Sequence, residues 1–170
     1  MNVIYTCLLG LIPFFASGQS LKEDKIDEFT KHVVKRTSWE VLTQTFKMQT
    51  FGRISKIEDQ YYFDFKVAMG GPLFSIGKDQ ELMLKLANET IVTLPNPTLK
   101  IACRGCGVPG FAGSAGLGVE IAYPLTIAQL DELRKSPIVK IRVYTTDGYV
   151  ENEVRGKNAG KIPAAIALVN

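Results

Sequence analysis

The fold is decided by residues 119–154, which read VEIAYPLTIAQLDELRKSPIVKIRVYTTDGYVENEV. The residues at the first junction predict a strand followed by a helix. Pro124 prevents an early helix, Thr126 occupies the N-cap position, and Gln129 completes a capping box three residues later. Leu125 and Leu130 have the spacing of a hydrophobic staple at the same helix start. We therefore expect a strand at 119–123 and a helix at 126–135.

This helix is predicted to bury one apolar face and to end at Ser136-Pro137. The apolar face consists of three residues at helical spacing, Ile127, Leu130 and Leu133. On the exposed side, Asp131 is placed to pair with Lys135 four residues later. Another strand is expected at 138–146. If it shares a sheet with the strand at 119–123, the two are parallel and joined by a right-handed crossover, which makes one β-α-β unit.

A β-hairpin is predicted at the end of the same stretch, because Asp147-Gly148 is a two-residue signal for a type I′ turn. Counting out from that turn pairs Arg142 with Glu153 and Val143 with Asn152. Charged and apolar pairs then lie on opposite faces, as a half-buried hairpin requires. The polar Asn152 opposite Val143 is the exception.

The rest of the chain contains further strand signals. Residues 61–69 alternate in polarity, and Gly70-Gly71-Pro72 stops that strand. Strands are also expected at 32–42, 43–57 and 98–102, with a bulge at Gly52, and residues 82–94 are expected to form a hairpin. Residues 20–30 are charged and show no strand period, so they are expected to form a mobile terminus.

The C-terminal segment predicts a second helix that begins near Ile162, with Pro163 in its first turn. Its apolar residues recur at helical spacing, namely Ile162, Ala165, Ile166 and Val169. We therefore expect an α+β fold: a largely antiparallel sheet of about six to eight strands, with one β-α-β unit and a C-terminal helix packed on one side.

The N-terminal segment is typical of a secretory signal peptide, because an apolar run is followed by Ala16-Ser17-Gly18. We expect cleavage after Gly18, one globular α+β domain at 19–170, and a secreted or periplasmic location in a bacterium. An N-terminal core strand is the alternative. The apolar run is too short for a retained transmembrane helix and is interrupted by Pro13. The net charge of +3, with its signs interspersed, argues against a nucleic-acid partner.

A glycine-rich segment at 103–118 begins with Cys103 and Cys106, for which we expect a local disulfide or two free thiols. Redox chemistry would need a helix after the cysteines to lower the thiol pKa, and a zinc site would need further ligands. These remain the alternatives. Long loops in compact domains are often functional, so we take Arg104, Phe111 and Leu117 as candidate binding residues of this loop.

No residue is assigned a catalytic role. His32 is the only histidine and is expected at the surface, while Asp64 is expected on a solvated strand face. We expect a non-enzymatic binding or interaction domain of the periplasm or cell envelope, with a protein or envelope component as partner and without cofactor or metal. The alternative is a small hydrolase or ligand-binding protein with a site under loop 103–118. A cluster of His32, Asp64 or Tyr123 beneath that loop would favour it.

Overall fold

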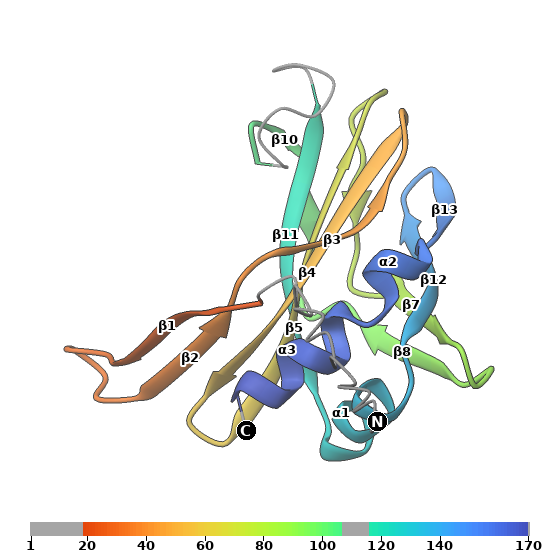
Figure 1. The fold of residues 1–170 in the computed structure, drawn as a ribbon. Helices are drawn as coiled ribbons and strands as arrows, with labels where there is room; N and C mark the ends of the chain where they lie inside the picture. The colour runs from red at the N-terminus through yellow and green to blue at the C-terminus, as the bar shows by residue number, and fades with distance from the viewer. Residues whose placement is uncertain (1–18, 107–115, 170) are drawn as a thin grey trace, which may run out of the picture.

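The computed structural model describes residues 19–106 and 116–169, which form thirteen strands and three helices (Figure 1). The predicted signal peptide at 1–18 and the candidate residue Phe111 lie outside the described residues. All strand pairings within those residues are antiparallel. The predicted α+β class with a largely antiparallel arrangement of strands is therefore confirmed.

Seven strands form the largest sheet, in the order β1-β2-β4-β5-β11-β10, and β3 also pairs with β4. Their bounds are Leu21–Ile26 for β1, Val33–Thr37 for β2, Glu40–Gln44 for β3, Met48–Ile57 for β4, Gln60–Met69 for β5, Cys103–Arg104 for β10 and Leu117–Leu125 for β11. β5 pairs along one edge of β4. β2 and β3 both pair with the other edge, β3 near the start of β4 and β2 near its end.

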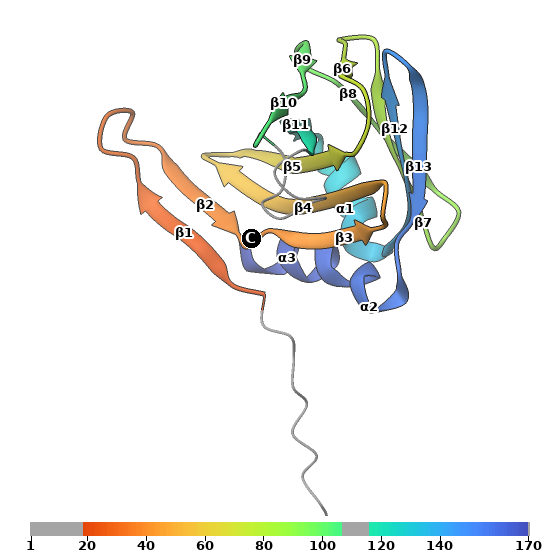
Figure 2. The same cartoon turned by 90° about the horizontal axis from the view of Figure 1, so that it is seen from above.

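A second sheet has four strands in the order β13-β12-β7-β8, and two short strands, β6 and β9, form a separate pair. Their bounds are Ser75–Ile76 for β6, Glu81–Leu86 for β7, Ile91–Pro95 for β8, Lys100–Ile101 for β9, Ile138–Thr145 for β12 and Gly148–Glu153 for β13. Viewed from above, the four-stranded sheet lies beside β3, β4 and β5 of the seven-stranded sheet (Figure 2).

The predicted β-α-β unit is not confirmed, although strand, helix and strand follow one another along the chain. β11 belongs to the seven-stranded sheet and β12 belongs to the four-stranded sheet. Helix α1 (Ile127–Lys135) thus connects two sheets and is not a crossover within one sheet. The condition of a shared sheet is not met, so no parallel pair forms between these two strands.

The start of α1 agrees with the prediction, since Thr126 and Gln129 form the reciprocal capping box. The helix buries Leu130 and Leu133, but Ile127 is exposed, so the apolar face is narrower than predicted. The predicted pair of Asp131 with Lys135 is replaced by a pair with Arg134, three residues along. Both spacings bring side chains together on a helix surface.

The C-terminal helices cover the side of the seven-stranded sheet that faces the core. α2 (Gly156–Ala159) is a single turn, and α3 (Lys161–Val169) packs against β2, β3, β4 and α1. The four residues predicted for the buried face of α3 are all buried, namely Ile162, Ala165, Ile166 and Val169. The predicted C-terminal helix on one side of the sheet is therefore confirmed.

The β12–β13 hairpin is present, but the predicted register is wrong by two residues. Arg142 lies opposite Glu151 and Val143 opposite Val150, and the two-residue loop is Thr146-Asp147. Neither loop residue has a positive φ, as a type I′ turn would require; Gly148 has φ 109°. A shift of two residues keeps every side chain on its predicted face, because side chains alternate with a period of two.

Residues 20–30 are not the predicted mobile terminus, because β1 pairs along β2 in a hairpin that we call the arm (residues 21–37). The arm extends away from the rest of the molecule in both views (Figures 1 and 2). Most of β1 is exposed on both faces, so the strand needs no alternation of apolar and polar residues. The predicted strand at 32–42 is divided into β2 and β3 at Ser38-Trp39.

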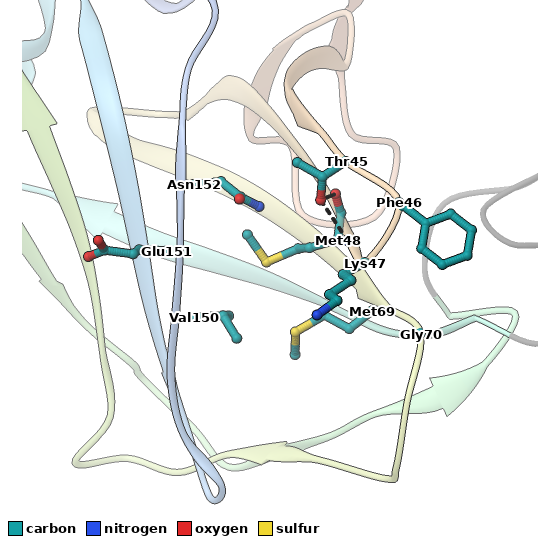
Figure 3. A pocket seen from close by; sticks show the side chains of 9 residues that line it. All are labelled: Thr45, Phe46, Lys47, Met48, Met69, Gly70, Val150, Glu151 and Asn152. Carbon is teal, nitrogen blue, oxygen red and sulfur yellow. Dashed lines mark hydrogen bonds between the residues drawn. The ribbon is translucent and has the colours of Figure 1, made fainter.

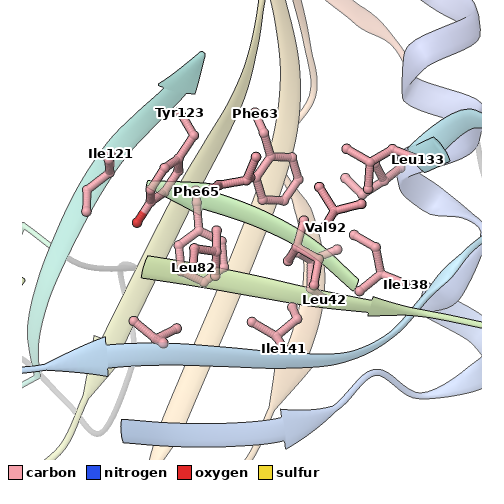
Figure 4. Close-up of a cluster of buried hydrophobic side chains, with 14 of the residues drawn as sticks. Leu42, Phe63, Phe65, Leu82, Val92, Ile121, Tyr123, Leu133, Ile138 and Ile141 are labelled. Carbon is pink, nitrogen blue, oxygen red and sulfur yellow. The ribbon is translucent and has the colours of Figure 1, made fainter. Parts of the chain in front are cut away.

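The hydrophobic core lies between the inner faces of the two larger sheets and the helices (Figure 4). Gly52 does not form the predicted bulge, since β4 pairs with β5 without interruption and the irregularity in the β3–β4 pairing lies in β3, at Leu42. A Cβ atom at Gly52 would lie 2.9 Å from Leu42 Cδ1 and 3.0 Å from Phe63 Cζ. Glycine is needed here because core side chains approach the backbone closely.

Candidate functional site

Asp64 is buried on the outer face of the seven-stranded sheet, which contradicts the prediction that it is solvated. Its carboxylate accepts hydrogen bonds from Arg53 Nε at 2.7 Å and from Ser55 Oγ at 2.5 Å. The register places Arg53 directly opposite Asp64 across β4 and β5. A buried carboxylate is tolerated only when it is paired and hydrogen-bonded, and Asp64 meets both conditions.

Trp39 extends this polar network from the bend between β2 and β3. The Arg53 guanidinium lies 4.3 Å from the centroid of the Trp39 ring, and Lys66 Nζ lies 4.2 Å from it. Glu120 in turn pairs with Lys66 at 3.1 Å. The charges of the network neutralise one another, so its geometry is that of a structural support for the β2–β3 bend.

The three residues that would favour a site under the loop are not brought together. His32 is exposed next to the tip of the arm, and Asp64 lies on the outer face of the sheet. Tyr123 is completely buried on the opposite, core-facing side (Figure 4). The Tyr123 hydroxyl has no hydrogen-bond partner among the described residues, and burial raises its pKa above the usual value.

The ends of the glycine-rich loop are anchored on β11. Cys103 and Cys106 are joined by a disulfide with their Cα atoms 5.3 Å apart. β10 pairs with β11 so that Arg104 lies opposite Leu117, and Leu117 packs partly against the core. Of the three candidate binding residues, Arg104 is thus exposed at the root of the loop, Leu117 is partly buried, and Phe111 lies outside the described residues.

A hollow of about 560 Å³ lies at the root of this loop. It is lined by two lysines, one glutamate, the disulfide and neighbouring backbone: Lys66, Lys100, Ile101, Cys103, Gly105, Cys106, Gly118, Val119 and Glu120. Lys66 is already paired with Glu120. Among the described residues, Lys100 has no ion-pair partner, so the hollow presents one available cation.

A second and more apolar hollow of about 520 Å³ lies where the ends of the two larger sheets meet (Figure 3). We call it the cleft. It is lined by the β3–β4 turn, the end of β5 and the edge strand β13, with Thr45, Phe46, Lys47, Met48, Met69, Gly70, Val150, Glu151 and Asn152. Three consecutive residues of β13 contribute, so the cleft runs along the edge of that strand.

The cleft combines an apolar floor with a few polar groups at its rim. Met48 and Met69 lie opposite each other across β4 and β5, and Val150 faces them from β13 (Figure 3). Methionine side chains are flexible and polarizable, so they adapt to apolar groups of different shape. Asn152 provides an amide, and Lys47 provides an ammonium group without an ion-pair partner among the described residues.

The β3–β4 turn is built locally, and it directs an apolar residue into solvent. The Thr45 N–H donates to the Met48 carbonyl at 2.9 Å, and the Met48 N–H donates to Thr45 Oγ1 at 3.1 Å. The Phe46 side chain, which lies within the predicted strand at 43–57, is 93% exposed at the rim of the cleft. Sequence reasoning placed Phe46 within one continuous strand and therefore missed both the turn and the cleft.

The Glu151 side chain lies on the outer side of the cleft and is held by Arg142. Arg142 Nη2 donates to Glu151 Oε2 at 2.8 Å, and Lys140 Nζ lies 3.5 Å from Glu151 Oε1. Hydrogen bonding to Arg142 is the main cause that lowers the pKa of the Glu151 carboxyl. Glu151 therefore stays ionised and paired at the surface, and the charge at the cleft that remains available is that of Lys47.

Comparisons with protein-family models, with curated proteins and with solved structures find no match to this chain. Within residues 19–106 and 116–169, no helix is both long and apolar enough to cross a membrane. In the same residues, no group of three or more His, Cys, Asp or Glu side chains is arranged to hold a metal ion.

Proposed function

We propose that this chain is an exported, non-enzymatic binding domain of the bacterial periplasm or cell envelope, and that it binds an apolar side chain of a protein partner in the cleft. The observation that carries this proposal is the cleft itself: an apolar hollow of about 520 Å³ with two methionines and one valine on its walls. A binding site of this kind is typically apolar with a few polar groups that fix orientation.

The surroundings of the cleft favour a protein partner over a small molecule. Phe46 continues the apolar surface beyond the cleft to the top of the β3–β4 turn. β13 is the last strand of its sheet, so alternate backbone N–H and C=O groups along it have no neighbouring strand in the described part of the chain. A polypeptide beside the cleft can satisfy such groups while an apolar side chain fills the hollow.

The polar networks described above support a binding role in a different way. Asp64 is engaged by Arg53 and Ser55, and Glu151 is engaged by Arg142, so these two carboxylates are held in structural pairs. The groups that stay available around the cleft are an ammonium, an amide and apolar side chains. Such groups bind a partner through apolar contacts, hydrogen bonds and ion pairs.

The test is binding of an environment-sensitive apolar dye, N-phenyl-1-naphthylamine, to the purified protein. We expect a fluorescence increase that is saturable, and we expect Val150→Glu to weaken dye binding by about tenfold or more, because it places an unpaired charge in the apolar hollow. Ile91→Glu is the matched control, since Ile91 is exposed in β8 and does not line the cleft. Equal binding by both variants, each folded by circular dichroism, would refute the cleft as the site.

Export is tested separately, by mass spectrometry of the protein expressed with its complete N-terminus in a bacterial host. The proposal expects a mature chain that begins at Gln19 in the periplasmic or extracellular fraction. Recovery of only the uncleaved chain in the cytoplasm would contradict it, and it would leave the cleft proposal unaffected.

The hollow at the root of the loop supports a second candidate function, binding of a small anionic ligand. Lys100 has no ion-pair partner among the described residues, and it faces the same hollow as the Lys66–Glu120 pair. Isothermal titration with small dicarboxylates would test this candidate. Binding that is lost in Lys100→Gln and kept in the exposed control Lys78→Gln would support it, and the absence of binding to the unmodified protein would refute it.

A further inference from the structure

The tip of the arm presents the most exposed large apolar side chain among the described residues. Phe29 is 94% exposed in the turn between β1 and β2. Two further apolar side chains close to it, Ile26 and Val33, are also exposed. Large exposed apolar side chains gathered at one point of a surface mark an interaction site when they are held in place.

The turn that carries Phe29 is held by several hydrogen bonds. The Asp27 carboxylate accepts from the backbone N–H groups of Phe29 at 3.0 Å and of Thr30 at 2.7 Å, and also from the Thr30 hydroxyl. The Asp27 N–H donates to the His32 carbonyl at 2.8 Å. These bonds fix the backbone on both sides of Phe29, so little conformational entropy is lost when its ring binds a partner.

The arm is also tied to the body of the protein close to its tip. Glu58 has a positive φ in the β4–β5 turn, and its carboxylate accepts from the Val33 N–H at 2.7 Å. The Glu58 N–H donates to the Val33 carbonyl at 3.0 Å. The position of the tip relative to β4 is therefore set by backbone pairing and by these additional bonds.

The cleft and the arm lie at opposite ends of β4. Met48, the first residue of β4, forms part of the cleft, whereas Ile57, its last residue, pairs with Val34 in the arm. Ten residues of β-strand extend about 30 Å, and Phe29 lies farther out still. The arm of one molecule therefore does not reach its own cleft.

The charges next to the two apolar features are complementary. Glu28 precedes Phe29 in the tip, and Lys47 precedes Met48 at the rim of the cleft. Neither side chain has an ion-pair partner among the described residues. Methionine sulfur also contacts aromatic rings favourably, so Met69, which is partly exposed in the cleft, is a suitable contact for the Phe29 ring.

We infer that the cleft of one copy of this chain binds the arm tip of a second copy, with the Phe29 ring against Met69 and Val150 and with Glu28 beside Lys47. This inference rests on the proposed binding role of the cleft and names its partner. The contact is heterologous, because the two surfaces differ. A pair joined by one such contact still has one free arm and one free cleft, so the contact repeats head to tail into a ring or an open chain.

The test is a complementation experiment by sedimentation velocity, with one variant lacking the arm contact and one lacking the cleft. Phe29→Asp has an intact cleft, and Val150→Glu has an intact arm. We expect the unmodified chain to form oligomers across a concentration series up to about 1 mM, and each variant alone to associate at least about tenfold more weakly. We expect a mixture of the two to form a one-to-one dimer and nothing larger.

A charge exchange provides a second readout that does not depend on packing. Glu28→Lys and Lys47→Glu should each weaken association, and the double variant should recover it, since the ion pair is restored with its sign reversed. Ile91→Glu is the control that should associate like the unmodified chain. A monomeric unmodified chain, or a mixture of Phe29→Asp and Val150→Glu that stays monomeric, would overturn the inference. If the naphthylamine dye still binds in that case, the cleft remains a binding site with a different partner.

Discussion

Substitution of Asp64 by alanine should destabilise the protein strongly, because it removes one partner of an ion pair on the outer face of the sheet. The Asp64 and Arg53 side chains are 7% and 19% exposed. Breaking a fully buried pair from one side costs about 3–5 kcal/mol of unfolding free energy. Since Arg53 keeps some contact with water, we expect a loss near the lower limit, about 3 kcal/mol.

The assay is urea unfolding followed by the fluorescence of Trp39. Trp39 is the only tryptophan in the chain, and its ring lies on Arg53. The signal therefore reports on the network that the substitution changes. The free energy of unfolding at zero denaturant is obtained by linear extrapolation, with the slope compared between variants to confirm two-state behaviour.

Two further variants separate the pair from a general effect of charge. Glu120→Gln removes a carboxylate that is 47% exposed, so it should change the free energy of unfolding by less than about 1 kcal/mol. The double variant Arg53→Met with Asp64→Ala should lose less than the sum of the single losses, because no unpaired charge is left. A loss below about 1 kcal/mol for Asp64→Ala would refute the assignment of Asp64 to a structural pair.

Three other substitutions test the core, the surface and the backbone. Tyr123→Phe should raise the free energy of unfolding by about 1 kcal/mol, since it removes a buried hydroxyl without a partner among the described residues; a clear loss in chemical denaturation would show that the hydroxyl is satisfied. Glu151→Gln should lower the melting temperature at pH 7, and by progressively less as the pH falls below 4.5: hydrogen bonding to Arg142 lowers the pKa of Glu151 from its ordinary 4.5, so the stabilisation is present above pH 4.5 and is lost as the pH falls through the lowered value. Melting temperatures of the two proteins that stay equally far apart throughout an acid titration would contradict that pairing. Gly52→Ala should cost about 1–3 kcal/mol, because its Cβ would collide with Leu42, and an unchanged melting temperature would disprove the close approach.

Local signals in the sequence predicted α1 and α3 well because short-range interactions determine them. The capping box of Thr126 and Gln129 involves only residues three apart in the sequence. Pro163 is compatible with a helix only in its first turn, so it indicates where α3 begins. The buried face of α3 follows from spacing alone. Ile127 was placed wrongly because helical spacing does not reveal how wide a surface the neighbouring elements cover.

The arm and the Asp64 pair could not be predicted from the sequence, for a common physical reason. A strand with both faces exposed, like β1, has no apolar alternation to detect. The strand that contains Asp64 alternates regularly in polarity, but the burial of Asp64 depends on Arg53 in another strand and on the position of Trp39 above that strand. Both features are set by pairing between strands, which one-dimensional periodicity does not contain.

The cleft shows how a small error of register changes the interpretation of a surface. The predicted turn placed Asn152 opposite Val143, a polar residue in an apolar row. In the observed register Val150 takes that position, and Asn152 lies opposite Ile141 on the same face. The same shift brings Glu151 opposite Arg142, which engages the carboxylate of β13 nearest the cleft. The turn at Thr146-Asp147 therefore decides which carboxylate of β13 is paired with Arg142, and with Glu151 paired, the charge that remains available at the cleft is that of Lys47.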